Sequence, residues 1–225
     1  MSKIIVENSI DKVKEDPCIS WRDSSLLDKV KLNSSAPPSD NPFDEVDTEC
    51  EKYLLNEPIP NQGRVHGYYT LIHNITAALP ERSNILEVGH REGLSSLCIY
   101  DALNESSKFV TIDIVQDLRF VPSKVFKDPQ FICGTANSLD PFSALTVHRY
   151  VFPNKFDLVF FDTLHTYKQI SAEYNNFKNI LSDDCIILVD DINIADKGKF
   201  YDEWKGQKWN LGKEFHSSGF GVFVK

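Results

Sequence analysis

Apolar positions recur with two different periods along residues 63–225 and predict strands that alternate with helices. Short runs rich in β-branched and aromatic residues predict strands at Asn84–Val88, Phe109–Ile114, Gln130–Cys133, Leu158–Phe161 and Cys185–Val189. Between the last two strands, apolar side chains at helical spacing predict a helix that contains Ile170, Tyr174, Phe177 and Leu181. Alternating strands and helices are typical of a parallel sheet that is covered on both faces.

Further elements are predicted on either side of these strands. A stripe of apolar residues from Tyr68 to Leu79 ends at Pro80, and we expect a helix there. Another helix is expected within Lys197–Gln207. The final segment, Lys213–Lys225, predicts an antiparallel hairpin with its turn at residues 217–219. The predicted fold class is therefore α/β, with an antiparallel edge.

Residues 1–60 differ from this region because they are rich in proline, serine and aspartate and have few periodic patterns. We therefore divide the chain into an N-terminal extension, residues 1–60, and an α/β domain, residues 61–225. Apolar groups at Ile4–Val6, Trp21 and Leu26–Val30 are expected to dock on the domain. The extension is interpreted either as a partly ordered tail or as a lid or a contact between copies in a homo-oligomer.

Composition excludes several classes of partner. The net charge of the 225 residues is −9, and no run of lysine and arginine stands out, so a nucleic-acid partner is not expected. The five cysteines are scattered without C-x-x-C spacing, which argues for a reducing compartment. Neither a secretory signal nor a membrane span is recognised, so we expect no membrane partner and a cytoplasmic location.

Carboxylates follow two of the predicted strands. Asp162 ends one strand, and Asp190 and Asp191 end the next, so the three side chains are expected at one edge of the sheet. They would repel one another unless a cation lay between them, and a hard divalent ion such as Mg²⁺ is the simplest partner. His165 follows Asp162 by three residues and is placed to accept a proton from a hydroxyl nucleophile.

The same residues also have plainer interpretations. Asp162 could cap the helix that follows it, and Asp190 and Asp191 could be ordinary loop residues at a strand end. His165 could be a structural or substrate-orienting histidine.

A glycine-containing loop follows the first predicted strand. Gly89 and Gly93 allow a ligand to approach the backbone closely, and Asp113, at the end of the next strand, is placed to accept hydrogen bonds from ribose hydroxyls. A dinucleotide-binding loop would have glycines where this chain has Arg91 and Leu94. The pattern thus favours a nucleoside ligand without phosphates over NAD, and the alternative is an ordinary strand–helix turn.

The spelling E-x-G-x-x-x-G, from Glu87 to Gly93, resembles motif I of class I S-adenosylmethionine-dependent methyltransferases. The resemblance covers residues 63–225 and implies a Rossmann-like seven-stranded sheet with the order 3-2-1-4-5-7-6, in which strand 7 is antiparallel. It also implies S-adenosylmethionine as cofactor, with the segment Gln62–Tyr68 closing over its methionine end. The cofactor-binding residues that follow from it are Glu87, Gly89, Gly93, Asp113, Asn137, Ser138 and Asp162.

The acidic cluster resembles the site of metal-dependent O-methyltransferases of the catechol and caffeoyl-coenzyme A type. Those enzymes have an Asp-Asn pair after strand five and a lysine three residues after the first aspartate. This chain has Asp191 in place of the asparagine and His165 in place of the lysine. Its D-x-x-H-x-Y spelling, from Asp162 to Tyr167, is closer to a broader bacterial group that includes sugar and macrolide O-methyltransferases.

The sequence therefore predicts methyl transfer from S-adenosylmethionine to a hydroxyl of a small molecule. His165 and Asp162 are the predicted catalytic residues, and Asp162, Asp190 and Asp191 are the predicted ligands of Mg²⁺ or another divalent cation. Two alternatives stay open. One is a metal-independent N-methyltransferase whose acids bind an amine, and the other is a non-catalytic S-adenosylmethionine-binding module.

Overall fold

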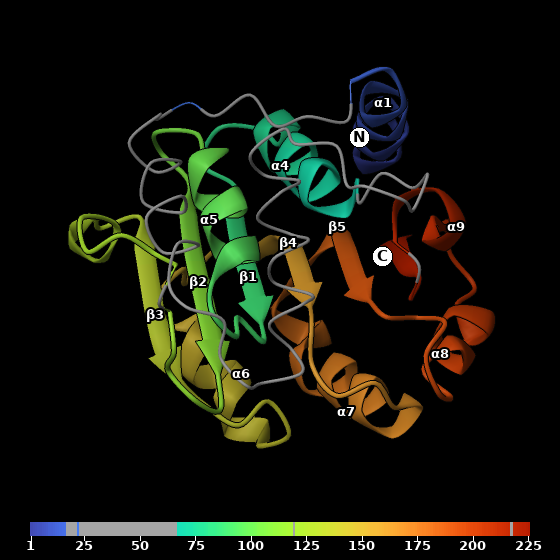
Figure 1. Cartoon of the computed structure of the whole chain (residues 1–225). Coiled ribbons are helices and arrows are strands. Elements are labelled where there is room, and N and C mark those ends of the chain that lie inside the picture. The colour runs from blue at the N-terminus through green and yellow to red at the C-terminus, as the bar shows by residue number, and fades with distance from the viewer. Residues whose placement is uncertain (17–21, 23–66, 119, 217) are drawn as a thin grey trace, which may run out of the picture.

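The computed structural model describes residues 1–16, 22, 67–118, 120–216 and 218–225. Within this part of the chain, seven strands form one sheet with the order β3-β2-β1-β4-β5-β7-β6 (Figure 1). The strands are β1 Asn84–Val88, β2 Lys108–Asp113, β3 Phe131–Thr135, β4 Phe156–Phe161, β5 Leu181–Asp190, β6 Lys208–Asn210 and β7 Phe220–Val224. Because β7 is antiparallel to both β5 and β6, the structure confirms the predicted order and the predicted antiparallel strand.

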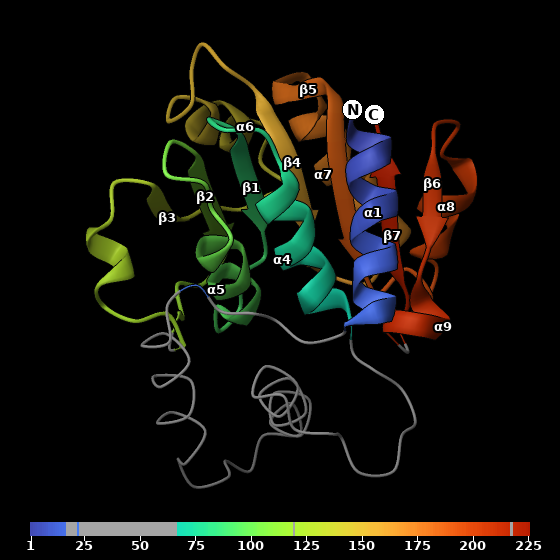
Figure 2. The same cartoon turned by 90° about the horizontal axis from the view of Figure 1, so that it is seen from above.

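Helices cover both faces of the sheet (Figures 1 and 2). Helices α1, α4 and α5 pack on one face, and α6, α7 and α8 pack on the other. The helices are α1 Ser2–Glu15, α4 Tyr68–Ala78, α5 Leu94–Asp101, α6 Pro141–His148, α7 Tyr167–Phe177, α8 Gly198–Glu203 and α9 Gly212–Phe215. Among the described residues, no helix is long and apolar enough to cross a lipid bilayer.

The continuous apolar runs of the sequence become strands that are buried on both faces. In β4, Leu158 and Phe160 join the core beneath α1, α4 and α5, whereas Val159 and Phe161 join the core beneath α6, α7 and α8. Successive side chains of a strand point to opposite faces, so a strand between two helical layers has no polar alternation.

Helix α7 begins at a cap of its own. The Thr166 side chain accepts a hydrogen bond from the backbone N–H of Gln169 at 3.2 Å, which satisfies one of the free donors of the first turn. The interpretation of Asp162 as the cap of this helix is therefore excluded. Ile170 and Phe177 are buried against the sheet, as their helical spacing predicted.

The predicted hairpin at residues 213–225 is wrong in its first half. Residues 212–215 form the short helix α9, and the strand that pairs with β7 is β6, three residues long and earlier in the chain. The Asn210 side chain accepts a hydrogen bond from the backbone N–H of Gly212 at 3.0 Å, which turns the chain away from β6 at that point. The connection between β6 and β7 therefore contains α9 in addition to a turn, which the Gly219 N–H closes by donating to the His216 carbonyl at 3.0 Å.

The first fifteen residues pack into the domain. Helix α1 lies beside α4 and buries Ile5, Val6, Ile10 and Val13 in the core (Figure 2). Within the predicted docking group Ile4–Val6, Ile5 and Val6 are buried and Ile4 is exposed. Trp21 and Leu26–Val30 lie outside the described residues, and the role of the extension stays a prediction.

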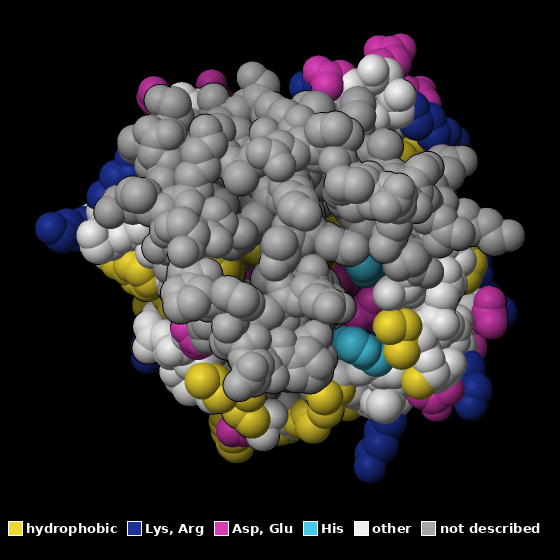
Figure 3. Space-filling view, in the orientation of Figure 1, with side chains coloured by type: hydrophobic (Ala, Val, Ile, Leu, Met, Phe, Trp, Pro, Cys, Tyr) yellow, Lys and Arg dark blue, Asp and Glu magenta, His cyan; other side chains and the backbone are white. Residues whose placement is uncertain are grey.

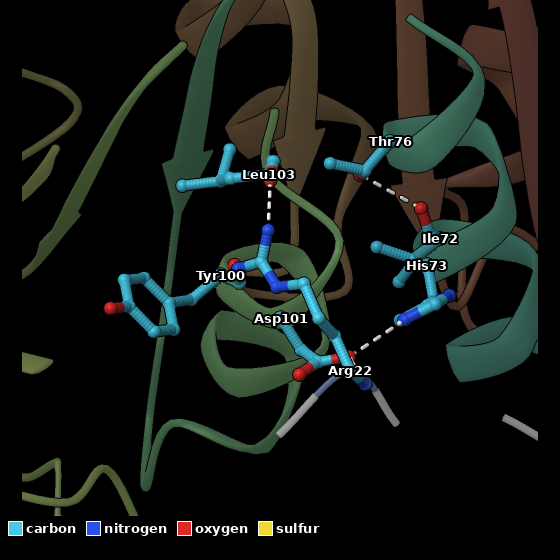
Figure 4. A network of polar contacts seen from close by, with 7 residues as sticks. All are labelled: Arg22, Ile72, His73, Thr76, Tyr100, Asp101 and Leu103. Atoms are coloured by element: carbon cyan, nitrogen blue, oxygen red, sulfur yellow. Dashed lines mark hydrogen bonds and ion pairs between the residues drawn. The ribbon is translucent and has the colours of Figure 1, made fainter. Parts of the chain in front are cut away.

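Arg22 joins the extension to two helices of the domain (Figure 4). Its backbone N–H donates to the buried carboxylate of Asp101 at 2.9 Å, and its guanidinium donates to the carbonyls of Tyr100 and Leu103 at the end of α5. His73 of α4 contacts the same Asp101 oxygen at 3.1 Å. A cation at the C-terminus of a helix is favoured by the helix dipole, so this network fastens residue 22 to α4 and α5.

Candidate active site

A pocket of about 710 Å³ opens at the carboxyl ends of β1, β2, β4 and β5. One side is lined by the loop Gly89–Gly93 and by Asp113, and the other by Asp162, His165 and the pair Asp190–Asp191. Figure 3 shows histidine and acidic side chains next to each other in a hollow of the face seen in Figure 1. The pocket thus joins the two groups of residues that the sequence singled out separately.

Glycine is required at both ends of the loop. Gly89 has φ +91°, and a Cβ there would lie 1.8 Å from the carbonyl oxygen of Asp162. Gly93 has φ +93°, and a Cβ there would lie 2.6 Å from the Val121 side chain. The loop therefore approaches β4 so closely that only glycine fits, and its backbone forms the floor of the pocket.

Asp113 fixes the shape of this loop from the end of β2. One carboxylate oxygen accepts hydrogen bonds from the backbone N–H groups of His90 at 3.0 Å and Arg91 at 2.9 Å. The other oxygen accepts one from the N–H of Val115 at 3.2 Å. Asp113 lines the pocket, and the oxygen that accepts only from Val115 has a further lone pair for a ligand hydroxyl.

The structure places Glu87 behind the loop and not in the pocket. Its side chain is fully buried and accepts hydrogen bonds from Ser95 at 2.6 Å, from Thr111 at 2.6 Å and from Ser96. Burial raises the pKa of Glu87 to about 7, although the three hydroxyls oppose this shift. The predicted contact of Glu87 with a cofactor is therefore corrected: it joins β1, β2 and α5 beneath the loop.

Asn137 and Ser138, for which contacts with the adenine are predicted, line the pocket beyond Asp113. The Ser138 hydroxyl donates to Glu173 of α7 at 2.6 Å, and Thr163 donates to the other Glu173 oxygen at 2.7 Å. Glu173 is buried, and burial raises its pKa. A role for Glu173 was not predicted from the sequence, where it stands out only as a carboxylate next to the apolar stripe of α7.

The acids of the cluster have different environments. Burial raises the pKa of Asp162 to about 6, with attraction to Lys197 opposing the shift and repulsion from Asp191 adding to it. Burial also raises the pKa of Asp190 well above its ordinary value. Burial acts in the same direction on Asp191, but the hydrogen bond from His216 and the charge of His165 hold its pKa below the ordinary value. The protein thus keeps Asp191 ionised most firmly.

His165 lies at the predicted position beside the cluster. Its Nε2 is 2.9 Å from an Asp191 carboxylate oxygen, and the side chain, which is 45 % exposed, lines the pocket. Asp191 holds the imidazole from one side, which leaves the other ring nitrogen to a ligand.

Two cationic residues near the acids were missed. His216, after α9, has Nε2 3.4 Å from Asp190 and 3.3 Å from Asp191, and the hydrogen bond and charges of these acids raise its pKa against the effect of burial. Lys197 is fully buried, and its Nζ has no hydrogen-bond partner among the described residues. His216 fell within the wrongly predicted hairpin, and Lys197 had no local signal.

Tyr68 lines the pocket. It belongs to the segment Gln62–Tyr68, whose predicted closure over the methionine end of the cofactor stays a prediction. Its ring stacks on His216 with 4.6 Å between the centroids. Residues 62–66 of that segment lie outside the described residues.

Comparisons with known proteins agree with this arrangement. Residues 86–192 match a family model described as a methyltransferase domain. A search of curated proteins found no match.

Solved structures share the fold across nearly the whole chain. An O-methyltransferase from Bacillus cereus in complex with S-adenosylhomocysteine superposes with a TM-score of 0.57 and 18% identity, over 100% of this chain and 99% of the other. A second match is the O-methyltransferase TomG from Streptomyces achromogenes, which is involved in tomaymycin synthesis and was solved in complex with S-adenosylmethionine. Its TM-score is 0.56 and its sequence identity 18%, over 88% of this chain and 95% of the other. A methyltransferase from Geobacter sulfurreducens superposes with a TM-score of 0.55 and 14% sequence identity, over 92% of this chain and 98% of the other.

At this identity the structures establish the fold alone, and the similarity to a methyltransferase domain covers residues 86–192. The motif around Gly89 and the acid at Asp113 lie inside the matched residues and meet in one pocket. Residues 86–192 are therefore similar to a methyltransferase domain, and the sheet has the strand order that the sequence motifs predicted.

Proposed function

We propose that the protein transfers a methyl group from S-adenosylmethionine to a hydroxyl oxygen of a small molecule, with assistance from a divalent cation. The observation that carries this proposal is the single pocket that joins the glycine loop and Asp113 to His165 and the acidic cluster. Cofactor and acceptor would occupy the two halves of this pocket, with the reacting atoms between them.

The cofactor half suits a nucleoside with a charged amino-acid tail. S-adenosylmethionine, when bound, supplies a methyl group already activated by its sulfonium. Asp113 would accept hydrogen bonds from the ribose, and Asn137 and Ser138 would lie beside the adenine. The backbone of Gly89–Gly93 would follow the ribose and the methionine, and Asp162 would lie near the sulfonium end. The Bacillus and Streptomyces neighbours, solved with S-adenosylhomocysteine and S-adenosylmethionine, support this choice of cofactor.

The acceptor half suits removal of a hydroxyl proton. When neutral His165 donates its Nε2–H to ionised Asp191, Nδ1 carries the lone pair and can accept a proton from the acceptor hydroxyl. The negative Asp191 then stabilises the imidazolium that forms. Positioning the oxygen in line with the methyl group is the other task of the pocket.

The cluster fits a divalent cation. Ligand atoms of Asp190, Asp191 and His216 all lie within 4.8 Å of one another, and Asp162 lines the same pocket without belonging to this group. A divalent ion bound there supplies positive charge that favours the ionised form of an acceptor hydroxyl. Asp190 and Asp191 would hold it, and Asp162 as a further ligand stays a prediction.

A second candidate is metal-independent N-methylation. The observation in its favour is that Lys197 and His216 place positive charge beside the acids, so the cluster has internal counter-charges. An amine acceptor would then be bound by the carboxylates directly. Assays with hydroxyl-bearing and amine-bearing small molecules, each with and without EDTA, separate the two. Amine methylation that survives EDTA would replace the main proposal.

Calorimetric titration with S-adenosylhomocysteine, S-adenosylmethionine and NAD tests the cofactor. We expect the two sulfur nucleosides to bind and NAD not to bind. Gly89→Ala should abolish binding because its Cβ would collide with the Asp162 carbonyl. Gly134→Ala is the matched control, since a Cβ at Gly134 meets no atom within 4 Å. Binding of NAD alone would contradict the proposal, and binding without turnover on any acceptor would favour a non-catalytic module.

A further inference from the structure

His216 occupies a position that no motif assigned to the metal. The predicted ligands, Asp162, Asp190 and Asp191, supply oxygen only, whereas the structure groups Asp190 and Asp191 with a histidine nitrogen. We propose that His216 is a direct ligand, so that the site binds its cation through mixed nitrogen and oxygen donors and prefers a transition metal to Mg²⁺. This inference rests on the divalent cation of the proposed function.

The distances have the spacing of ligands around a common ion. His216 Nε2 lies 3.4 Å from an Asp190 oxygen and 3.3 Å from an Asp191 oxygen. Two donors with bonds of about 2.1 Å to one metal are separated by about 3.0 Å at a right angle and about 3.4 Å at the tetrahedral angle. Charge-assisted hydrogen bonds are shorter, at about 2.7–2.9 Å. His216 thus lies as far from each of these two oxygens as ligands of a shared ion would, and its contact with Asp191 is also within hydrogen-bond distance.

One donor of the group lacks any other partner. Asp190 is 5% exposed, and its Oδ1 accepts no hydrogen bond from the described residues. An unsatisfied buried carboxylate oxygen is costly, so it points to a ligand that the protein does not itself provide. Because this oxygen faces His216 and lines the pocket, a cation between the two would satisfy it.

The surrounding residues hold His216 in place. Its ring stacks on Tyr68 at an interplanar angle of 37°, and its carbonyl accepts a hydrogen bond from the N–H of Gly219 at 3.0 Å. Asp191 has φ +56°, an uncommon conformation for a residue other than glycine and one that often marks functional sites. The surrounding contacts therefore hold the ligand atoms in fixed positions, as a metal site requires.

The two histidines of the site have separate partners. His165 contacts Oδ2 of Asp191, and His216 contacts Oδ1 of the same carboxylate. His216 can thus bind a metal together with Asp191 Oδ1 while His165 keeps its bond to Oδ2. This division leaves His165 to take the proton and assigns the metal to His216.

The donor set decides the choice of metal. Mg²⁺ prefers oxygen ligands, whereas imidazole suits the later first-row metals, whose affinities rise from Mn²⁺ through Co²⁺. The competing explanation is that His216 is protonated and pairs with the two acids as a fixed cation. In that explanation the protonated His216 itself neutralises Asp190 and Asp191, and no metal is bound. A metal on His216 would displace the imidazole proton, so measuring metal binding distinguishes the two explanations.

The test is calorimetric titration of the full chain with Co²⁺ and with Mg²⁺, for the wild type, His216→Phe and His148→Phe. Phenylalanine keeps the stack on Tyr68 and removes the donor, and His148 is the matched control because it lies outside the pocket. We expect the wild type and His148→Phe to bind Co²⁺ at least about tenfold more tightly than Mg²⁺. Since loss of outer partners alone costs about 10–100-fold, His216→Phe should lose about 100-fold or more in Co²⁺ affinity.

X-ray absorption at the cobalt edge gives a readout that does not depend on activity. The wild type should show the outer-shell scattering of one imidazole, and a His165→Ala variant should retain it. If His216→Phe fails to fold in thermal unfolding, His216→Gln is used in its place. Equal Co²⁺ affinity in the wild type and in the folded His216 variant, or a cobalt spectrum without imidazole, would overturn the inference.

Titration of the same preparations with S-adenosylhomocysteine separates this inference from the proposed function. Nucleoside binding with no role for His216 in metal binding would refute the inference alone. Metal binding through His216 without nucleoside binding would refute the methyltransferase proposal and leave the metal site standing.

Discussion

Glu87→Gln tests how the glycine loop is supported. Glu87 is fully buried among three hydroxyl donors, and burial raises its pKa from 4.5 to about 7. Below about pH 7 the folded protein therefore keeps this carboxyl protonated, whereas the unfolded chain releases the proton above its ordinary pKa. Since the folded state binds more protons between these values, the wild type should lose stability as the pH rises from about 4.5 to about 7.

The size of the effect follows from the difference between the two pKa values. At about 1.4 kcal/mol for each pKa unit, the change from 4.5 to about 7 corresponds to about 3 kcal/mol. Glutamine stays neutral and resembles the protonated carboxyl, so the variant should not lose stability through this residue as the pH rises. Relative to the wild type, Glu87→Gln should thus gain about 3 kcal/mol in free energy of unfolding between pH 4.5 and pH 8.

Urea unfolding of both proteins at several pH values in this range measures the difference. Glu105→Gln is the matched control, because Glu105 is exposed, and this variant should not reproduce the gain of Glu87→Gln. We also expect Glu87→Gln to retain S-adenosylhomocysteine binding, since Glu87 does not line the pocket. A stability difference that is constant with pH, or that turns against the variant at high pH, would refute the reasoning.

The remaining predictions concern the site and its attachment. Asp113→Asn should weaken S-adenosylhomocysteine binding about tenfold or more in calorimetry, because one charged hydrogen-bond acceptor is lost, whereas Asp183→Asn at an exposed position should not. His165→Ala should lower kcat about 10²–10⁴-fold in a methyl-transfer assay, with His148→Ala as control, and unchanged turnover would exclude His165 as the base. Asp101→Asn should lower the free energy of unfolding by about 1–3 kcal/mol, because it weakens buried hydrogen bonds to His73 and Arg22. An unchanged unfolding midpoint would contradict that role.

The sheet could be predicted because its strands carry strong local patterns. The apolar runs in β4 and β5 reflect burial on both faces, and the stripe of α7 reflects burial on one. The end of the chain was harder to predict, since β6 is three residues long and is stabilised by pairing with β7 rather than by its own pattern. Helix α6 was also missed, although the Asp140 cap and Pro141 mark its start.

The site was predictable as far as it depends on strand ends. Asp113, Asp162 and Asp190 each lie where a parallel strand stops, so the topology alone brings them together. The direction in which a side chain points does not follow from topology, and Glu87 therefore proved to be a support beneath the loop. His216 reaches the cluster only because α9 and the stack on Tyr68 place it there, and such contacts between distant residues leave no local pattern.

The most direct test of the central claim is a crystal structure of the protein with S-adenosylhomocysteine. The account predicts the nucleoside in the pocket, with the ribose hydroxyls at the Asp113 carboxylate and the sulfur turned towards Asp162 and His165. A nucleoside bound elsewhere, or one whose ribose does not contact Asp113, would contradict it.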